Sequence, residues 1–158
     1  MKVTEQDLNI LVELQKDAKQ PLKDLSKKLK VPISTLHSRI SKLEKSGVIK
    51  KYTAILDPGK LDMDFTALVF CTLKFQYGNE KPVTMEKIVE KIKLIPEVQS
   101  IFLTTGQRDL ILKIKSHKVG DVSAIIADKI RSIKGIEGSE TYVCFDVVKE
   151  SLDLPLND

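Results

Sequence analysis

Residues 30–49, KVPISTLHSRISKLEKSGVI, decide how the first part of this chain folds. Pro32 has no amide hydrogen and disfavours helix in the residue before it, so a preceding helix must end here. Ser34 belongs to the residue types that cap helices, which predicts a new helix from Ser34 to about Ser46. Gly47 suits the left-handed position that ends helices. The stretch therefore predicts a breaker turn followed by a helix.

Two further helices are predicted before this stretch, and an extended segment after it. Thr4 is a candidate N-cap with Asp7 three residues on, and leucines follow at helical spacing. Pro21 suits the first turn of a second helix, whose apolar stripe repeats every three to four residues. Residues 48–56 are expected to be extended. The first 55 residues thus predict a three-helix, winged helix-turn-helix domain.

The predicted third helix has two chemically different faces. Leu36, Ile40 and Leu43 share one face and would pack on the second helix. The opposite face carries hydroxyls and cations, which reach base edges and phosphates in the major groove of double-stranded DNA. The expected DNA contacts, including two lysines beyond the helix that would touch phosphates, are Ser34, Thr35, His37, Ser38, Arg39, Ser41, Lys42, Lys45, Lys50 and Lys51. A plain three-helix bundle with a solvated third helix fits the same pattern.

The charge of the chain is unevenly distributed. Residues 1–60 carry 13 Lys/Arg and 7 Asp/Glu, a net charge of +6, whereas residues 61–158 carry 13 and 15, a net charge of −2. A polyanion would be drawn to the first part only. The alternative is that lysine-rich helices simply keep the protein in solution.

A domain boundary is predicted at the Asp57-Pro58-Gly59 turn. We expect a helix-turn-helix domain over 1–55, a linker over 56–65, a second domain over 66–150 and a tail over 151–158. In the second domain, alternating patterns predict strands at about 66–75, 98–105, 110–115 and 137–145, with helices from Thr84 to Ile95 and at about 119–134. This β-α-β-β-α-β order predicts an α+β chain whose second domain is a ferredoxin-like sandwich.

The open face of the predicted sheet is too apolar to be left in water. Strict alternation assigns to it Leu68, Phe70, Ile101, Leu103, Ile111 and Val143. A second copy of the chain would cover this face, so we expect a homodimer at least.

Several classes of protein find little support in the sequence. No apolar run approaches the ~20 residues that span a bilayer, and the N-terminus lacks a signal core, so a cytoplasmic protein without a membrane partner is expected. Cys71 and Cys144 are expected to be reduced thiols, and neither they nor His37 have metal-ligand neighbours. His117 follows a strand without an acid partner, so no enzyme is expected. Because ferredoxin-like folds also host enzymes, an enzyme or a free-standing metabolite-binding domain stays as an alternative.

The first half of the chain resembles the start of Lrp/AsnC (feast/famine) regulators. The shared residues are Asp7, Ile10, Leu11, Leu14, Asp17, Ala18, Leu25, Ser26, Ser34, Arg39, Ile40, Leu43, Glu44, Gly47, Val48, Ile49 and Tyr52. The second half resembles their effector-binding domain in Thr105-Gly106-x-x-Asp109, Thr141-Tyr142-Val143 and Val148-Lys149. It departs at Asp62, where the family usually has Gly, in the long loop 76–82, and at Gln107 and Arg108, where an aromatic residue is common.

The resemblance implies a DNA-binding regulator that forms dimers and then rings, often octamers of four dimers. An amino acid bound between dimers usually modulates such proteins, and no other cofactor is implied. The implied effector residues are Leu103, Thr104, Thr105, Gly106, Gln107, Arg108, Asp109, Val122, Tyr142 and Val143. Amides at Gly106 and Gln107 could hold a carboxylate and Asp109 an ammonium, although Asp109 also suits a turn residue that bonds its own backbone. A regulator or architectural DNA-binding protein without effector remains an alternative.

Overall fold

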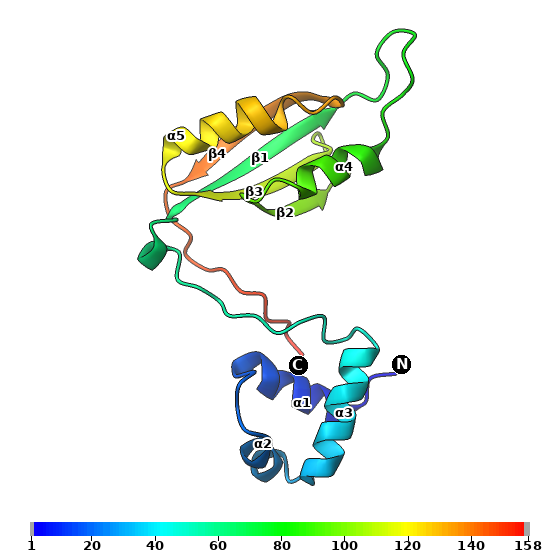
Figure 1. The fold of residues 1–158 in the computed structure, drawn as a ribbon, viewed down its shortest axis with the longest axis vertical. Coiled ribbons are helices and arrows are strands. Elements are labelled where there is room, and N and C mark those ends of the chain that lie inside the picture. The colour runs from blue at the N-terminus through cyan, green and yellow to red at the C-terminus, as the bar shows by residue number, and fades with distance from the viewer. Residues whose placement is uncertain (1, 157–158) are drawn as a thin grey trace. The chain divides into compact units, whose positions relative to one another are not determined.

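The computed structural model describes residues 2–156, which form an α+β structure of two compact units (Figure 1). The chain up to Ile55 and the C-terminal segment from Ser151 form the first, here named the helical unit. Leu56–Glu150 form the second, the sheet unit. No helix within residues 2–156 is long and apolar enough to cross a membrane.

The helical unit is built from the three helices that the sequence predicts. They are α1 (Glu5–Lys16), α2 (Leu22–Leu29) and α3 (Ile33–Lys45). Their apolar stripes meet in one core, whose fully buried members are Ile10, Leu25, Leu36 and Leu43. The leucine spacing therefore identified the inward faces of α2 and α3 correctly, whereas in α1 the fully buried apolar residue is Ile10 and Leu11 and Leu14 are only partly buried.

The ends of the helices differ in part from the prediction. Thr4 and Asp7 form the expected reciprocal capping box of α1. The prediction that Ser34 caps α3 is wrong, because Pro32 already has the extended backbone of an N-cap and the helix begins at Ile33. Residues 48–56 form no strand. The α2–α3 turn passes through Lys30, whose φ of 54° is left-handed.

The sheet unit has the predicted β-α-β-β-α-β order. Its elements are β1 (Phe65–Leu73), α4 (Met85–Lys93), β2 (Val98–Leu103), β3 (Leu110–Ser116), α5 (Val119–Ala124) with the π-helix η2 (Ile125–Ile130), and β4 (Ile136–Cys144). The antiparallel sheet has the order β2-β3-β1-β4, and the helices cover one of its faces (Figure 1). The core lies between helices and sheet and includes Ala67, Val69, Ile88, Ile92, Leu110, Leu112 and Ile114.

The phase of two strands differs from strict alternation. Ile101 lies opposite Leu112 and packs against the helix-side core, and Leu103 lies opposite buried Leu110. An irregularity between Val98 and Ser100 shifts the register of β2 by one residue, and a shift of one moves every later side chain to the other face. Assigning Ile101 and Leu103 to the open face was therefore wrong.

The fourth strand shows the same reversal. Val143 lies opposite buried Ala67 and so belongs to the helix side, while Tyr142 lies opposite Leu68 on the open face. Adjacent apolar residues at 142 and 143 left the alternation ambiguous. The apolar residues of the open face are Leu68, Phe70, Phe102, Ile111 and Tyr142, and the rings of Phe70 and Tyr142 pack edge to face with centroids 5.2 Å apart.

The C-terminal segment packs on the first helix of the helical unit. The side-chain amide of Gln15 donates to the carbonyl of Leu154 at 3.0 Å, and the amide of Leu154 donates to Gln15 Oε1 at 2.8 Å. The side-chain amide of Gln15 thus forms the same two hydrogen bonds with the main chain of Leu154 that a residue on a neighbouring β-strand would form. Leu154, which the sequence assigned to the tail, is therefore held by α1.

Candidate functional sites

The outer face of α3 carries most of the side chains predicted to contact DNA. Ser34, His37, Ser38, Lys42 and Lys45 are exposed, as are Lys50 and Lys51 beyond the helix. Thr35, Arg39 and Ser41 are half-buried at the sides of this face. Because Leu36 and Leu43 fix the opposite face in the core, the exposed hydroxyls and ammonium groups are presented on a firm support.

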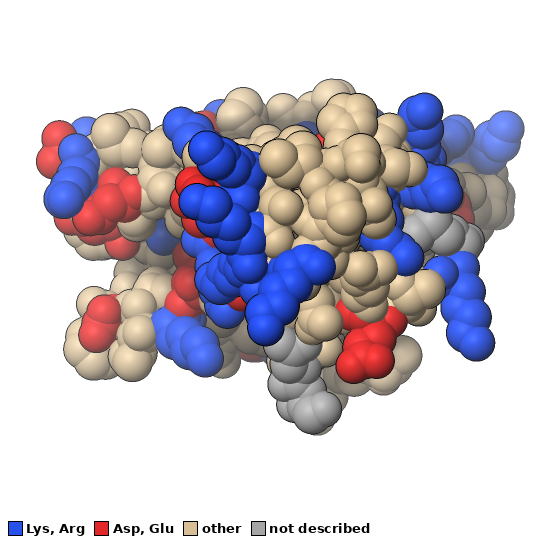
Figure 2. All heavy atoms as spheres, turned by 90° about the horizontal axis from the view of Figure 1, so that it is seen from below, with Lys and Arg blue, Asp and Glu red and all other residues tan. Residues whose placement is uncertain are grey.

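Cations gather on the surface of the helical unit. Figure 2 looks onto this unit and shows Lys and Arg side chains gathered in a band, with Asp and Glu side chains to either side. One buried acid, Glu13, is paired with Lys16 and Lys28. Hydrogen bonds from these two lysines hold the pKa of Glu13 below its usual range. The band of Lys and Arg side chains on this surface would attract a polyanion.

Arg39 has a structural bond that the sequence did not reveal. Its Nη1 donates to Asp7 Oδ1 at 2.8 Å and to Thr4 Oγ1 at 3.2 Å, which ties α3 to the start of α1. Burial of Asp7 opposes its charge, but hydrogen bonds from Thr4 and the Arg39 guanidinium outweigh burial and lower the pKa of Asp7. Arg39 therefore positions α3, and its contact with DNA stays a prediction.

The predicted effector turn, residues 103–109, joins β2 to β3. The amide of Thr104 donates to the carbonyl of Asp109 at 3.0 Å and closes the turn. A Cβ added to Gly106 would meet no atom within 4 Å, so the backbone there is open to an approaching molecule. Thr105 and Gln107 are exposed, and Arg108 forms an ion pair with Glu140 of β4, a partner that the sequence analysis missed.

Asp109 is bonded to the sheet. Its Oδ2 accepts from the amide of Leu73 at 2.7 Å, and its own amide donates to the carbonyl of Cys71 at 2.9 Å. Leu73 lies where the pairing of β1 with β4 is irregular, so the carboxylate satisfies an amide there. Asp109 thus combines a structural role with the proposed ammonium contact, for which Oδ1 is the oxygen without this bond.

Three other predicted effector residues lie apart from the turn. Val122 is 2% exposed in the core, on the helix that follows the far end of β3. Tyr142 is exposed on the open face and Val143 on the helix side of β4. Within the sheet unit, the ion pair of Arg108 with Glu140 links the turn to β4. Val122 lies away from the turn.

The two cysteines are free thiols. Cys71 is buried and Cys144 half-buried. Burial raises the pKa of Cys71 to about 11, which keeps it protonated and unreactive near neutral pH. Within residues 2–156, no group of three His, Cys, Asp or Glu side chains could hold a metal ion.

Two family descriptions match the two units. Residues 4–50 match the winged helix-turn-helix DNA-binding family, and residues 68–154 match the Lrp/AsnC ligand binding domain. The second match covers more than half of the chain.

Relatives and solved structures extend the match over nearly the whole chain. The HTH-type transcriptional regulator FL11 of Pyrococcus furiosus is 35% identical over 150 residues, covering 95% of this chain and 94% of that protein. The regulatory protein AsnC of Haemophilus influenzae is 31% identical over 137 residues and 87% of each chain. An AsnC family transcriptional regulator from Agrobacterium tumefaciens superposes with a TM-score of 0.87 at 25% identity over 97% of each chain. A regulator from Neisseria meningitidis in complex with L-Met shares the fold, with a TM-score of 0.88 at 23% identity over 99% of this chain and 98% of that one. This chain therefore belongs to the Lrp/AsnC family of helix-turn-helix transcriptional regulators, with an N-terminal DNA-binding domain and a C-terminal ligand-binding domain.

Proposed function

We propose that this regulator binds DNA through the exposed face of α3 and that an amino acid at the 103–109 turn modulates its binding or assembly. The observation that carries the first part is the firm, cation-bearing outer face of α3 opposite a buried leucine face. Ser38 and Lys42 are exposed at the centre of this face, where they can meet base edges and phosphates. Lys50 and Lys51 add phosphate contacts beyond the helix.

Dimerisation through the open face of the sheet completes this function. Phe102 and Tyr142 are more than half exposed, and with Leu68, Phe70 and Ile111 they form a continuous apolar surface. Pairing two such faces would remove this surface from water and would join two α3 helices in one assembly. We propose the dimer as the DNA-binding species and an octamer of four dimers as its larger assembly.

An amino acid is the effector that the turn suits. Gly106 leaves the backbone open and Asp109 offers one carboxylate oxygen for an ammonium, while Arg108 can attract a carboxylate. The relative from Neisseria meningitidis is described in complex with L-Met, which supports this class of ligand. A regulator without effector, or an architectural DNA-binding protein, is the second candidate.

One set of measurements tests these proposals. We expect salt-dependent, sequence-selective DNA binding by fluorescence anisotropy, and an elution volume that corresponds to a dimer or a multiple of it. Calorimetry with each of the twenty amino acids should give heat with at least one of them. Binding that is equally strong on unrelated DNA, with no heat from any amino acid, would favour the architectural candidate.

A further inference from the structure

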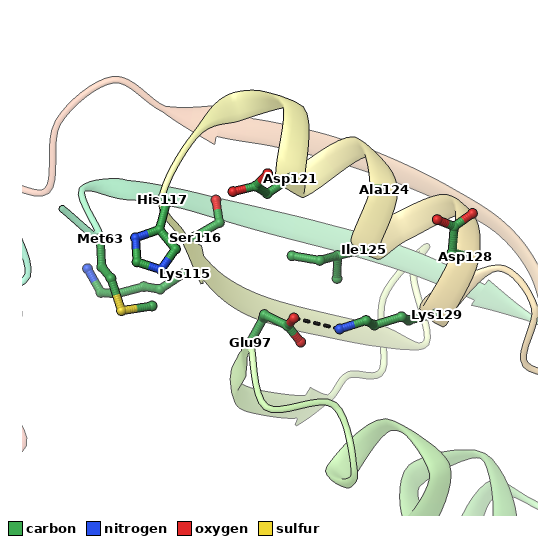
Figure 3. A pocket seen from close by; sticks show the side chains of 10 residues that line it. All are labelled: Met63, Glu97, Lys115, Ser116, His117, Asp121, Ala124, Ile125, Asp128 and Lys129. Carbon is green, nitrogen blue, oxygen red and sulfur yellow. Dashed lines mark hydrogen bonds and ion pairs between the residues drawn. The ribbon is translucent and has the colours of Figure 1, made fainter. Parts of the chain in front are cut away.

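The sheet unit contains a cavity of about 350 Å³ between the start of β2, the end of β3 and the helix formed by α5 and η2 (Figure 3). Its acidic side chains come from different elements, and the one interaction drawn among its lining residues joins Glu97 to Lys129. These lining residues show no common point of contact for a ligand. In the helical unit, by contrast, two contacts converge on the end of α3.

The first of these contacts is made by Tyr52. Its hydroxyl donates to Glu44 Oε1, in the last turn of α3, at 2.9 Å. Partial burial of the phenol and, after it, the Glu44 carboxylate raise the pKa of Tyr52 to about 12, so the hydroxyl keeps its proton and donates near neutral pH. The Tyr52 side chain is 48% exposed, so this hydrogen bond lies at the surface and not in the core of the helical unit.

The second contact is made by Ile49. Its amide donates to the carbonyl of Leu43 at 3.1 Å, and its side chain packs against the core of the helical unit. Leu43 is itself fully buried, so the chain is held firmly at Ile49. Both contacts thus attach the segment that follows α3 to neighbouring residues of that helix.

Lys50 and Lys51 lie between these two attachments. Both lysines are exposed, and residues 50–57 have no regular secondary structure that could hold them. A chain spans at most about 3.5 Å per residue, so with both ends attached neither lysine can move far from the end of α3. Without the Tyr52 hydrogen bond, the segment would be held at Ile49 alone among these two.

We propose that Tyr52 is a positioning residue for DNA binding, whose hydrogen bond to Glu44 holds Lys50 and Lys51 beside α3 where they meet phosphates. This inference rests on the function proposed for the helical unit. A segment that is not ordered beforehand must be ordered when DNA binds, and the entropy lost in that step weakens binding. Tyr52 orders the segment before DNA arrives and acts through the two lysines.

The first test uses the full-length protein without DNA. Trypsin cleaves after lysine, and it needs a chain that can leave its folded position. Tyr52→Phe should speed cleavage of the Lys50–Lys51 bond about threefold or more, because it removes one hydrogen bond to a charged group. Tyr77→Phe, in the loop 76–82 of the sheet unit, is the matched control and should leave that rate unchanged. Equal rates in the two variants, followed by mass spectrometry of the fragments, would overturn the proposal.

The second test compares DNA affinities by fluorescence anisotropy. Phosphate contacts do not depend on base sequence, so a labelled duplex of random sequence serves as the probe. Tyr52→Phe should weaken binding about threefold to tenfold, whereas Tyr77→Phe should not weaken it. In a protein that already carries Lys50→Ala and Lys51→Ala, Tyr52→Phe should change the affinity less than about twofold, since no ammonium is left to position.

The outcomes separate this inference from the function on which it rests. An equal loss of affinity with and without the two lysines would overturn the inference, because Tyr52 would then contact DNA itself or act through the stability of α3. Failure of the unsubstituted protein to bind the duplex would contradict the proposed function. Cleavage by trypsin would still decide whether Tyr52 holds Lys50 and Lys51 in place.

Discussion

The helix α3 and the 103–109 turn hold their exposed residues by different means. Leucines in the core fix α3 from one side, and the Arg39–Asp7 pair fixes it from another. The turn has no buried side chain of its own, and it is held by main-chain bonds and by Asp109. Several side chains on the inner side of α3 support that helix, whereas in the turn the support depends largely on Asp109, the residue that we also propose as an effector contact.

The largest effect is expected where the core holds α3. Leu36→Ala removes a fully buried side chain and should lower the free energy of unfolding of the helical unit by about 2–5 kcal/mol. DNA binding should be lost with it. Circular dichroism during thermal unfolding measures this change. An unaltered transition would show that the core does not support α3.

Substitutions of Arg39 and Lys42 separate a residue that holds α3 in place from one that we propose contacts DNA. Arg39→Ala should lower stability by about 1–2 kcal/mol, because it leaves Asp7 buried without its partner while solvent screens the exposed part of the pair. Lys42→Ala should keep stability and reduce the salt dependence of DNA binding by about one phosphate contact. Denaturant unfolding measures the stability of each variant, and fluorescence anisotropy at several salt concentrations measures the salt dependence of its DNA binding. Equal stability of both variants would contradict the assigned roles.

Asp109→Asn tests the double role in the turn. The amide oxygen of Asn can still accept from Leu73, so stability should fall by only about 1 kcal/mol, the difference between a charged and a neutral acceptor. Any response to an amino acid should weaken much more, since the ammonium loses its counter-charge. Calorimetry measures the response to the amino acid, and denaturant unfolding measures the change in stability. A full response in this variant would move the effector site elsewhere.

The contact of the C-terminal segment with α1 is expected to contribute less. Gln15→Ala removes both hydrogen bonds to Leu154 and should lower the stability of the helical unit by about 1 kcal/mol or less, because the pair is exposed. Removing residues 151–158 should have the same effect, and combining both changes should add nothing further. An additive double variant would mean that segment and helix act separately.

The smallest effect is a pH dependence of the helical unit. The pKa of Asp7 is lower in the folded protein than in the unfolded chain. The ionised carboxylate therefore contributes its full stabilisation at a pH above the pKa of the unfolded chain, and this stabilisation is lost as the pH falls through the pKa of the folded protein. Stability should therefore decline below about pH 4, the ordinary range of an Asp carboxyl. In Asp7→Asn this part of the decline should disappear. Acid titration followed by circular dichroism compares the two proteins.

Strand phase shows where the sequence was insufficient. Alternation placed Ile101 on the open face, but the irregularity near Ser100 turned it towards the core and brought Phe102 outward. A bulge depends on how two strands pair, so local alternation cannot reveal it. The homodimer stays a prediction, on an open face that carries Phe102 and Tyr142 and no longer Ile101, Leu103 or Val143.

Local spacing by itself determined the three helices, the inward faces of α2 and α3, the β-α-β-β-α-β order and the basic outer face of α3. These features follow from neighbours three or four residues apart in a helix and two apart in a strand. Tertiary structure alone decided the partners of Arg39, Asp109 and Gln15, which lie 32, 36 and 139 residues away. Such pairs depend on how elements pack, and no local pattern records that packing.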